Sequence, residues 1–237
     1  MSALSDLQQH LAHYWQLPHH DDEALNQKLT EVQAWQRARI KRTHSELFNK
    51  PKNKLMADYF LTQLYDGAEF KAIAKQLQRI VPKAQKVERF APATALETGS
   101  MAISASTLAI ELDLHLAEWL MEHSLPVNED TMLKAYRAVD EGDARKAQLE
   151  NVKEVCYRAD KYINSFMIRK AFGMTKRTAY RYNFNSLYDF INSGFAAMRP
   201  LYSVKGFIDP FCARELKIID KVHNSDSDNA AQVFEAA

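Results

Sequence analysis

Apolar residues recur along almost the whole chain at the three- and four-residue intervals that amphipathic helices require. In the first such segment, Leu4, Leu7, Leu11 and Tyr14 fall on one face, and the segment stops near Pro18. The pattern therefore predicts helices, rather than strands, from the start of the chain.

A second and longer helix is expected from Asp22 to about Phe48. One side of it is traced by a mainly apolar stripe that also holds two polar residues: Leu25, Leu29, Val32, Trp35, Gln36, Arg39, Ile40 and Leu47. Further helices are expected over residues 52–66, 69–81, 94–123, 128–140, 142–172, 183–198 and 209–222. These segments predict an all-α fold, a single-domain bundle of about eight or nine helices.

Glycines and capping residues indicate where these helices begin and end. We expect Gly67 and Gly173 each to end a helix, because glycine readily adopts the left-handed conformation found just after a helix. A loop over residues 174–182 would then follow. The spacing of Thr94 and Glu97 is that of a capping box, which predicts the start of a helix.

The last helix is expected to begin at Asp209 and Pro210, a cap followed by the residue type preferred in a first turn. The chain then becomes polar after Ser225. We expect residues 1–225 to form a single helical domain and residues 226–237 to form a disordered polar tail. No internal repeat or low-complexity linker divides the chain further.

Composition supports a globular helical protein. Of the 237 residues, 46% are hydrophobic and 26% charged, and only 6 Gly and 7 Pro are present, which favours long segments. Because 31 basic residues balance 30 acidic ones, no global field attracts nucleic acid or an anionic membrane, and we expect neither as a partner.

Cys156 and Cys212 lack paired spacing, which favours reduced thiols over a disulfide between them. With no secretory signal at the start, we expect a cytoplasmic protein.

Residues 57–67 read Ala-Asp-Tyr-Phe-Leu-Thr-Gln-Leu-Tyr-Asp-Gly, and they follow a basic run that begins at Arg39. This segment resembles a bacterial family of helical proteins named for an FFLEELY motif. Further similarity lies at residues 79–82, 111–113, 190–198 and 214–215. The resemblance spans about residues 33–222 and implies an all-helical cytosolic protein, without an established activity. Here Thr62 and Gln63 replace the two adjacent carboxylates of the motif, so no catalytic acid pair is expected there.

Asp113 is the polar residue whose position is most unusual. It lies two residues after Glu111, which places it on the opposite side of its helix, among small and apolar residues. We therefore expect Asp113 to be buried and paired, either in a structural ion pair or as the polar anchor of a ligand pocket. The candidate partners are His44, Arg79 and Tyr65, and these four residues form the predicted binding set for a ligand or partner.

The same helix carries Glu111, His115, Glu118 and Glu122 on one stripe. Such residue types can ligate metals, but this spacing is that of the solvated face of an amphipathic helix, and no Glu-x-x-His pair occurs. We expect no metal and no cofactor. Residues 19–22, His-His-Asp-Asp, are expected to form a polar turn between helices.

A basic and aromatic segment lies between Asp160 and Asp189, where no acidic residue occurs. Its basic residues are Lys161, Arg169, Lys170, Lys176, Arg177 and Arg181, and its aromatic residues include Tyr180, Tyr182 and Phe184. Lys176, Arg177, Tyr180 and Arg181 are the residues that would hold phosphates and stack bases. The balanced net charge and the absence of a known nucleic-acid-binding signature favour a solvated face instead.

No GxSxG, Walker A, GxGxxG or HExxH motif is present, so we expect a binding protein rather than an enzyme. The favoured function is a helical binding or regulatory module whose groove or cavity takes a protein partner or a small apolar ligand. The first alternative is an enzyme that uses a cofactor or pairs Asp113 with a nearby acid or base. The second is nucleic-acid binding through residues 161–184.

Overall fold

A computed structural model describes residues 3–64, 67–80 and 93–235. Over these residues the chain forms twelve α-helices and no strand, so the all-α prediction is confirmed, with more helices than the eight or nine expected. No helix in the described part is both long enough and apolar enough to cross a membrane.

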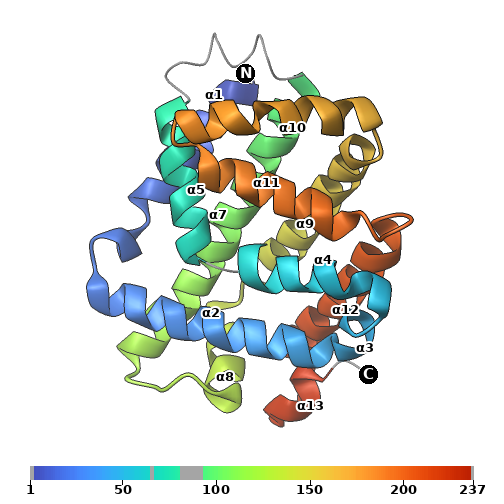
Figure 1. The fold of residues 1–237 in the computed structure, drawn as a ribbon. Coiled ribbons are helices and arrows are strands. Elements are labelled where there is room, and N and C mark those ends of the chain that lie inside the picture. Colours follow the sequence, from blue (N-terminus) through green and yellow to red (C-terminus); the bar gives the residue numbers. More distant parts are fainter. Residues whose placement is uncertain (1–2, 65–66, 81–92, 236–237) are drawn as a thin grey trace.

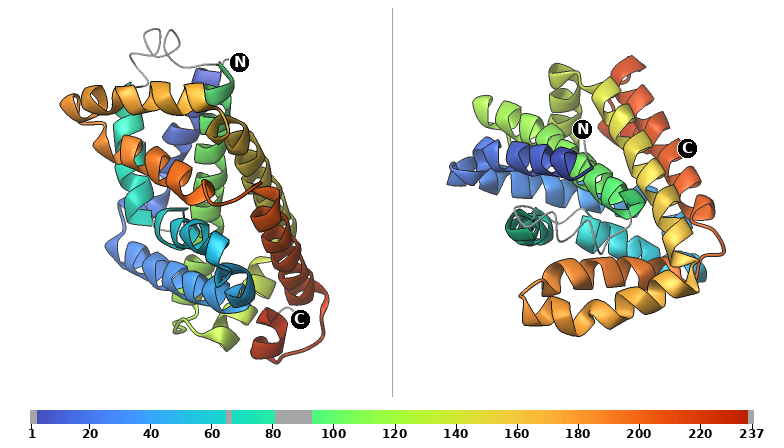
Figure 2. Two further views of the ribbon diagram at one scale, coloured as in Figure 1. Left: turned by 45° about the vertical axis from the view of Figure 1, so that its right-hand side comes forward. Right: turned by 90° about the horizontal axis from the view of Figure 1, so that it is seen from above.

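The first half of the chain forms α1 (Ala3–Gln16), the 3₁₀ turn η1 (Pro18–His20), α2 (Glu23–Thr43), α3 (Ser45–Phe48), the 3₁₀ turn η2 (Pro51–Asn53), α4 (Lys54–Tyr59), the π-helical turn η3 (Phe60–Leu64) and α5 (Gly67–Ile80). The second half forms α7 (Ala93–Glu122), α8 (Glu129–Val139), α9 (Gly142–Ile163), α10 (Phe166–Arg181), α11 (Asn185–Met198), α12 (Lys205–Asn224) and α13 (Ala230–Phe234). Helix α7 runs through the middle and packs against α1, α2 and α9, whereas α10 and α11 cross one end of the molecule (Figures 1 and 2).

The core consists of two hydrophobic clusters. The first draws mainly on α1, α2, α5, α7, α8 and α13, and the second on α3, α4, α9, α11 and α12. Helix α2 contributes to both, since Val32 belongs to the first cluster and Ile40 to the second. Between them on α2 lie Gln36 and Arg39, and Glu215 takes the corresponding place on α12. A layer of buried polar side chains therefore marks the boundary between the two apolar clusters.

Capping side chains begin several of the helices. At the start of α8, the Asn128 side chain accepts a hydrogen bond from the Thr131 backbone N–H at 3.0 Å and so caps the helix. At the start of α2, Asp22 accepts one from the Leu25 N–H, also at 3.0 Å. Helix α8 then ends at Asp140, whose φ of 52° is left-handed.

The prediction of a helix over 142–172 that ends at Gly173, with a loop over 174–182, is wrong. Ser165 divides this segment, because its hydroxyl oxygen accepts a hydrogen bond from the Ile168 N–H at 3.4 Å and so caps a new helix, α10. Gly173 lies inside α10. A short polar cap thus outweighs a glycine as the signal for a helix end.

Another predicted helix boundary is also wrong, because Gly67 begins α5 instead of ending the preceding helix. The predicted helix start at Thr94 is confirmed to within one residue, since α7 begins at Ala93. Thr94 itself lies inside the first turn, where its carbonyl accepts a hydrogen bond from the Thr98 hydroxyl at 2.8 Å, so it is not the cap residue. The candidate residue Tyr65 lies outside the described residues.

Asp209 and Pro210 do not begin α12, which starts at Lys205 and contains Pro210. Proline lacks the N–H that would reach back four residues to the Gly206 carbonyl. Because Gly206 is exposed in the first turn, water can satisfy that carbonyl, and the helix tolerates the proline.

The prediction of a disordered tail over 226–237 is also wrong, because this segment contains α13. Val233 and Phe234 are buried, and the Phe234 ring meets the Trp35 ring edge-on at a centroid distance of 5.0 Å. Arg137 donates hydrogen bonds to two backbone carbonyls in the preceding connection. The prediction failed because the polar residues that follow Ser225 precede a short apolar helix, α13, whose side chains pack into the core.

The predicted polar turn over residues 19–22 contains a buried histidine, because His19 is only 8% exposed. Its ring lies 4.0 Å from that of His20 and 6.0 Å from that of Tyr14, between centroids. Burial lowers the pKa of His19 to about 4, and the charges of His20 and Lys71 act in the same direction. The fold therefore holds His19 in its neutral form.

We predict that His19 makes the protein less stable as the pH falls from 6.5 toward 4. Its pKa is lowered in the folded state, so its stabilising contribution is present above the unfolded value of 6.5 and is lost as the pH falls through the folded value. The melting temperature of the His19→Leu variant should fall less between pH 7 and pH 5 than that of the wild type. The exposed His123→Gln substitution is the control, and equal falls for all three proteins would contradict the prediction.

Candidate functional site

Asp113 lies on α7 and is 3% exposed, so the predicted burial is confirmed. The predicted pairing is confirmed as well, because the Gln36 side-chain amide donates a hydrogen bond to Asp113 Oδ1 at 3.1 Å. The Arg145 guanidinium of α9 approaches the same oxygen at 3.4 Å. Its Nη2 makes a shorter bond, at 2.9 Å, to the Leu112 carbonyl. Arg145 is thus a more weakly bonded partner of the Asp113 carboxylate than Gln36 is.

Glu215 on α12 is the second buried carboxylate and is held more tightly. Arg39 donates from Nη1 to Oε1 at 3.0 Å and from Nη2 to Oε2 at 2.8 Å, which is a bidentate pair. His44, at the end of α2, adds a hydrogen bond in which its Nε2 lies 2.7 Å from Oε1 of Glu215. All of these side chains are less than 10% exposed.

Gln36 connects the two carboxylates. Its side-chain oxygen accepts a hydrogen bond from Arg39 Nε at 3.3 Å, while its amide nitrogen donates to Asp113 and to the Tyr136 hydroxyl. The Tyr136 ring also lies 4.5 Å from the Arg145 guanidinium carbon, a cation–π contact. We call this connected set the buried polar cluster: Gln36, Arg39, His44, Asp113, Tyr136, Arg145 and Glu215.

The two carboxylates of the cluster have pKa values shifted in opposite directions. Burial raises the pKa of Glu215, but the Arg39 charge and the hydrogen bonds from His44 and Arg39 outweigh it and lower the value to about 2. Burial also raises the pKa of Asp113, and there Arg145 and Gln36 offset it only in part. Glu215 is therefore a firmly ionised group, whereas the charge of Asp113 is held at a cost.

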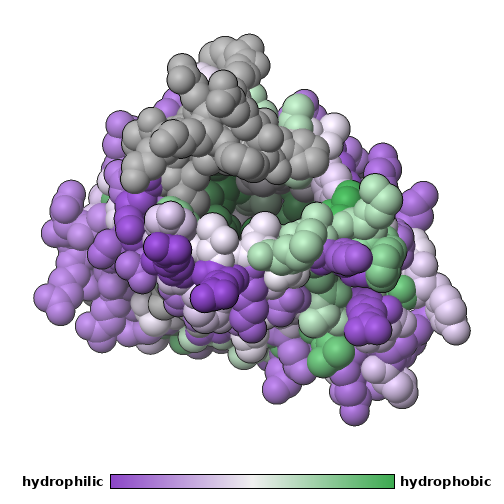
Figure 3. Space-filling view, turned by 45° about the horizontal axis from the view of Figure 1, so that its top comes forward, coloured by the Kyte–Doolittle hydropathy of each residue, from purple (hydrophilic) through white to green (hydrophobic). Residues whose placement is uncertain are grey.

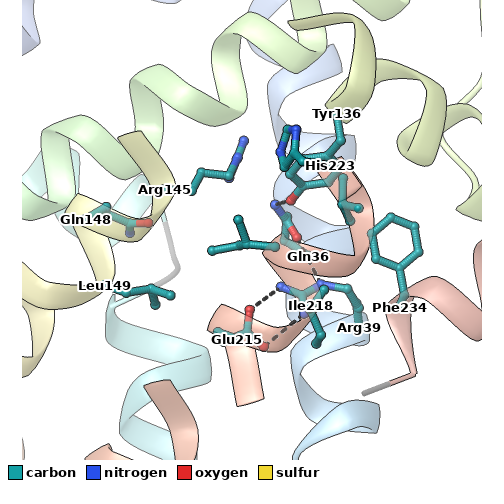
Figure 4. Close-up of a pocket in the computed structure, with 12 residues that line it drawn as sticks. Gln36, Arg39, Tyr136, Arg145, Gln148, Leu149, Glu215, Ile218, His223 and Phe234 are labelled. Atoms are coloured by element: carbon teal, nitrogen blue, oxygen red, sulfur yellow. Dashed lines mark hydrogen bonds and ion pairs between the residues drawn. The ribbon is translucent and has the colours of Figure 1, made fainter. Parts of the chain in front are cut away.

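A cavity of about 30 Å³ lies inside the cluster and is lined by the side chains that Figure 4 shows. That volume equals the space of about one water molecule, whereas pockets for organic ligands measure several hundred Å³. Polar groups such as Arg39, Arg145 and Glu215 point toward it. The cavity therefore suits a bridging water and has no room for a substrate or an apolar ligand.

The structure separates the four residues of the predicted binding set. His44 belongs to the cluster but bonds to Glu215, not to Asp113, so its assignment as an Asp113 partner is wrong. Arg79 lies on α5, where its guanidinium carbon is 5.6 Å from the Phe184 ring centroid, so it is not a partner of Asp113 either. Tyr65 lies outside the described residues.

Five members of the cluster were missed as site residues: Gln36, Arg39, Tyr136, Arg145 and Glu215. For two of them the sequence held a signal, because helical phase places Gln36 and Arg39 in the apolar stripe of α2, where a polar side chain must find a buried partner. Arg145 and Glu215 have no comparable local signal. Their burial depends on how α9 and α12 pack.

The acidic and histidine stripe of α7 lies at the surface, as its spacing predicts. Glu111 pairs with His13 at 3.1 Å, and His115 Nδ1 lies 2.7 Å from Glu141 Oε1. Within the described residues, no group of three or more His, Cys, Asp or Glu side chains could hold a metal ion.

The candidate nucleic-acid residues all lie on α10, which has no buried residue. Lys176, Arg177, Tyr180 and Arg181 are exposed. The Tyr180 hydroxyl is not free to contact a ligand, because it donates to the Asp189 carboxylate at 2.8 Å. One face of its ring also meets Lys176, whose Nζ lies 5.6 Å from the ring centroid.

A family model described as a domain of unknown function, DUF8198, matches residues 16–229. The chain belongs to the DUF8198 family. No curated protein and no solved structure significantly matches it. The match covers the whole buried polar cluster and the whole of α10, so both are parts of the DUF8198 domain.

We predict that the two buried carboxylates of the DUF8198 domain differ in their contribution to stability. Glu215→Gln should lower the free energy of unfolding by about 3–5 kcal/mol, because it leaves Arg39 buried without its charge partner. Asp113→Asn should cost only about 1–2 kcal/mol, because the amide can still accept from Gln36 and Arg145 keeps the Leu112 carbonyl. Urea unfolding followed by circular dichroism measures both.

We also predict that Glu215→Gln changes how the stability of the protein depends on pH. The pKa of Glu215 is lowered in the folded state, so its contribution is present above the ordinary value of 4.5 and is lost as the pH falls toward 2. The wild type should therefore lose more stability than Glu215→Gln over that range. Two results would contradict this difference between the carboxylates. One is an equal loss of unfolding free energy in Glu215→Gln and Asp113→Asn, and the other is a parallel dependence of stability on pH in the wild type and Glu215→Gln.

Proposed function

We propose that this chain is a helical binding module that docks a protein partner on the outward face of α10. The observation behind the proposal is where the exposed apolar side chains lie. Among the described residues, seven large hydrophobic side chains are exposed. Three of them, Phe166, Met167 and Met174, lie on this outward face, and Tyr180 and Tyr182 lie beside it near the end of α10. Concentrated apolar exposure of this kind typically marks an interaction site.

The outward face of α10 follows from its helical phase. On the inner side, the Phe172 ring stacks on that of Tyr188 at 4.6 Å between centroids. On the opposite side, six exposed side chains fall within a sector of about 100° at 100° per residue. This outward face consists of Phe166, Met167, Lys170, Met174, Arg177 and Arg181.

The composition of this face supports a protein partner. Phe166, Met167 and Met174 are 69%, 78% and 70% exposed, and aromatic residues, Met and Arg are the types enriched in protein interfaces. Figure 3 looks down on the end of the molecule that carries α10 and has apolar residues at its surface beside strongly hydrophilic ones. A helix of this length spans about 24 Å, enough for an elongated contact.

The buried polar cluster supports the binding module over the enzyme. Its cavity of about 30 Å³ is bordered by charged side chains that already bond to one another. Catalytic and ligand sites are usually larger and open to substrate. We therefore assign the cluster a scaffolding role, in which it fixes the helices that carry α10.

We also propose that the protein works in the bacterial cytoplasm. The resemblance to the bacterial family named for the FFLEELY motif supports this source. Cys156 and Cys212 support the compartment, because both are free thiols in the core rather than a disulfide. Nucleic-acid binding through α10 has less support, since Tyr180 is engaged with Asp189 and Lys176.

Site-specific photo-crosslinking in the host cell tests the proposed function. A photoreactive residue at Met167 or at Met174 should capture the same protein, because both side chains lie on the docking face. Tyr202, 97% exposed in the connection between α11 and α12, is the matched control and should capture nothing reproducible. Phe166→Ser should lower the yield at Met167 at least about tenfold, the effect of removing a large apolar contact.

Two results would contradict the proposed function. One is capture of the same proteins at Tyr202 as at Met167 and Met174, which would make the contact non-specific. The other is capture of lipid or nucleic acid, with no protein, at the α10 positions.

A further inference from the structure

The charge of the chain is distributed very unevenly. Residues 161–188 contain six Lys and Arg residues and no Asp or Glu, a net charge of +6. Because the whole chain has a net charge of +1, the remaining residues carry a net −5. Although the net charge of the whole chain is close to zero, residues 161–188 form a strongly basic segment. It includes α10, which lies at one end of the molecule (Figure 1).

Three of these cations form a line along α10. Lys170, Arg177 and Arg181 are seven and four residues apart, so they lie within about 40° of one another around the helix axis. All three are exposed, and none forms an ion pair with a carboxylate within the described part of the chain. By contrast, Arg158 on the neighbouring α9 pairs with Glu154 at 2.7 Å.

The apolar side chains of the outward face lie on both sides of this cationic line. Phe166 is on one flank, and Met167 and Met174 are on the other, at about 80–100° from Phe166. A helix that docks on a bilayer arranges its side chains differently, with one continuous apolar sector and cations at its margins. A single-strand nucleic-acid site needs several free aromatic faces, and this outward face has only Phe166.

We infer that the partner docks on the outward face through an acidic amphipathic helix. In-line carboxylates on that helix meet Lys170, Arg177 and Arg181, and apolar side chains on either side of them cover Phe166 and the two methionines. This inference rests on the proposed function and adds the chemistry of the partner. Opposite charges at the centre of the contact set the register of the two helices and speed their encounter.

Fluorescence anisotropy with a defined peptide tests the inference. The probe is a labelled helical peptide of about 18 residues, with Glu at three positions seven and four residues apart and Leu on both flanks. The control peptide has Gln at those three positions. The Glu peptide should bind at least about tenfold more tightly than the Gln peptide, and its affinity should fall at least about tenfold between about 50 and 300 mM salt.

Charge reversal locates the contact. The combined substitutions Lys170→Glu, Arg177→Glu and Arg181→Glu should weaken binding of the Glu peptide at least about tenfold. The matched control reverses three exposed lysines away from α10, Lys50→Glu, Lys52→Glu and Lys217→Glu, and so has the same net charge. It should bind within about twofold of the wild type, since distant charges are screened.

Other outcomes overturn the inference. These are equal binding of the Glu and Gln peptides, equal effects of the two charge-reversal variants, or no binding of the Glu peptide at all. Binding to phosphatidylglycerol–phosphatidylcholine vesicles or to a labelled oligo-dT, without binding to the peptide, would assign the face to lipid or nucleic acid.

The crosslinking experiment separates this inference from the proposed function. If a protein is still captured at Met167 in the α10 charge-reversal variant, the proposed function stands, but the inference of an acidic partner helix fails. If nothing is captured at Met167 in the wild type, the proposed function itself fails.

Discussion

The bidentate ion pair between Arg39 and Glu215 is the interaction on which the rest of the structure depends. It joins α2 to α12 at the boundary between the two apolar clusters, where an unpaired charge would cost several kcal/mol. Through Gln36 the pair reaches Asp113 on α7, and through Asp113 it reaches Arg145 on α9. Four central helices are thus held by directional bonds, and these bonds are all made only when the helices are packed in one arrangement.

In the proposed function, the buried polar cluster and the surface of α10 have complementary roles. Apolar contacts alone tolerate small shifts between helices, whereas a buried hydrogen-bonded network permits few alternatives. Helix α10 has no buried residue and packs mainly on α9 and α11, yet α9 is tied to the cluster through Arg145. A docking face on a fixed scaffold loses little conformational entropy when a partner binds. In the proposed function, the buried polar cluster therefore supports recognition on α10 without taking part in it.

Helical periodicity was sufficient to predict the all-α fold and the burial of Asp113, because both depend on local phase. The partners of Asp113 could not be predicted, since Gln36 and Arg145 are distant in sequence and meet it only through tertiary packing. The division between α9 and α10 was missed because the sequence prediction gave Gly173 more weight than the Ser165 cap. Lys176, Arg177, Tyr180 and Arg181 are exposed, as the predicted solvated face requires. The sequence shows the charges of this segment but not that Phe166 and Met167 remain uncovered.

A double-mutant cycle on Arg39 and Glu215 tests directly whether this ion pair holds α2 to α12. Arg39→Met and Glu215→Leu are made singly and together, and the free energy of unfolding of each protein is measured in urea. The double variant should be more stable than the sum of the two single losses implies, with a coupling free energy of at least about 2 kcal/mol. Additive losses, to within about 0.5 kcal/mol, would mean that the two side chains do not depend on each other and that the pair does not hold α2 to α12.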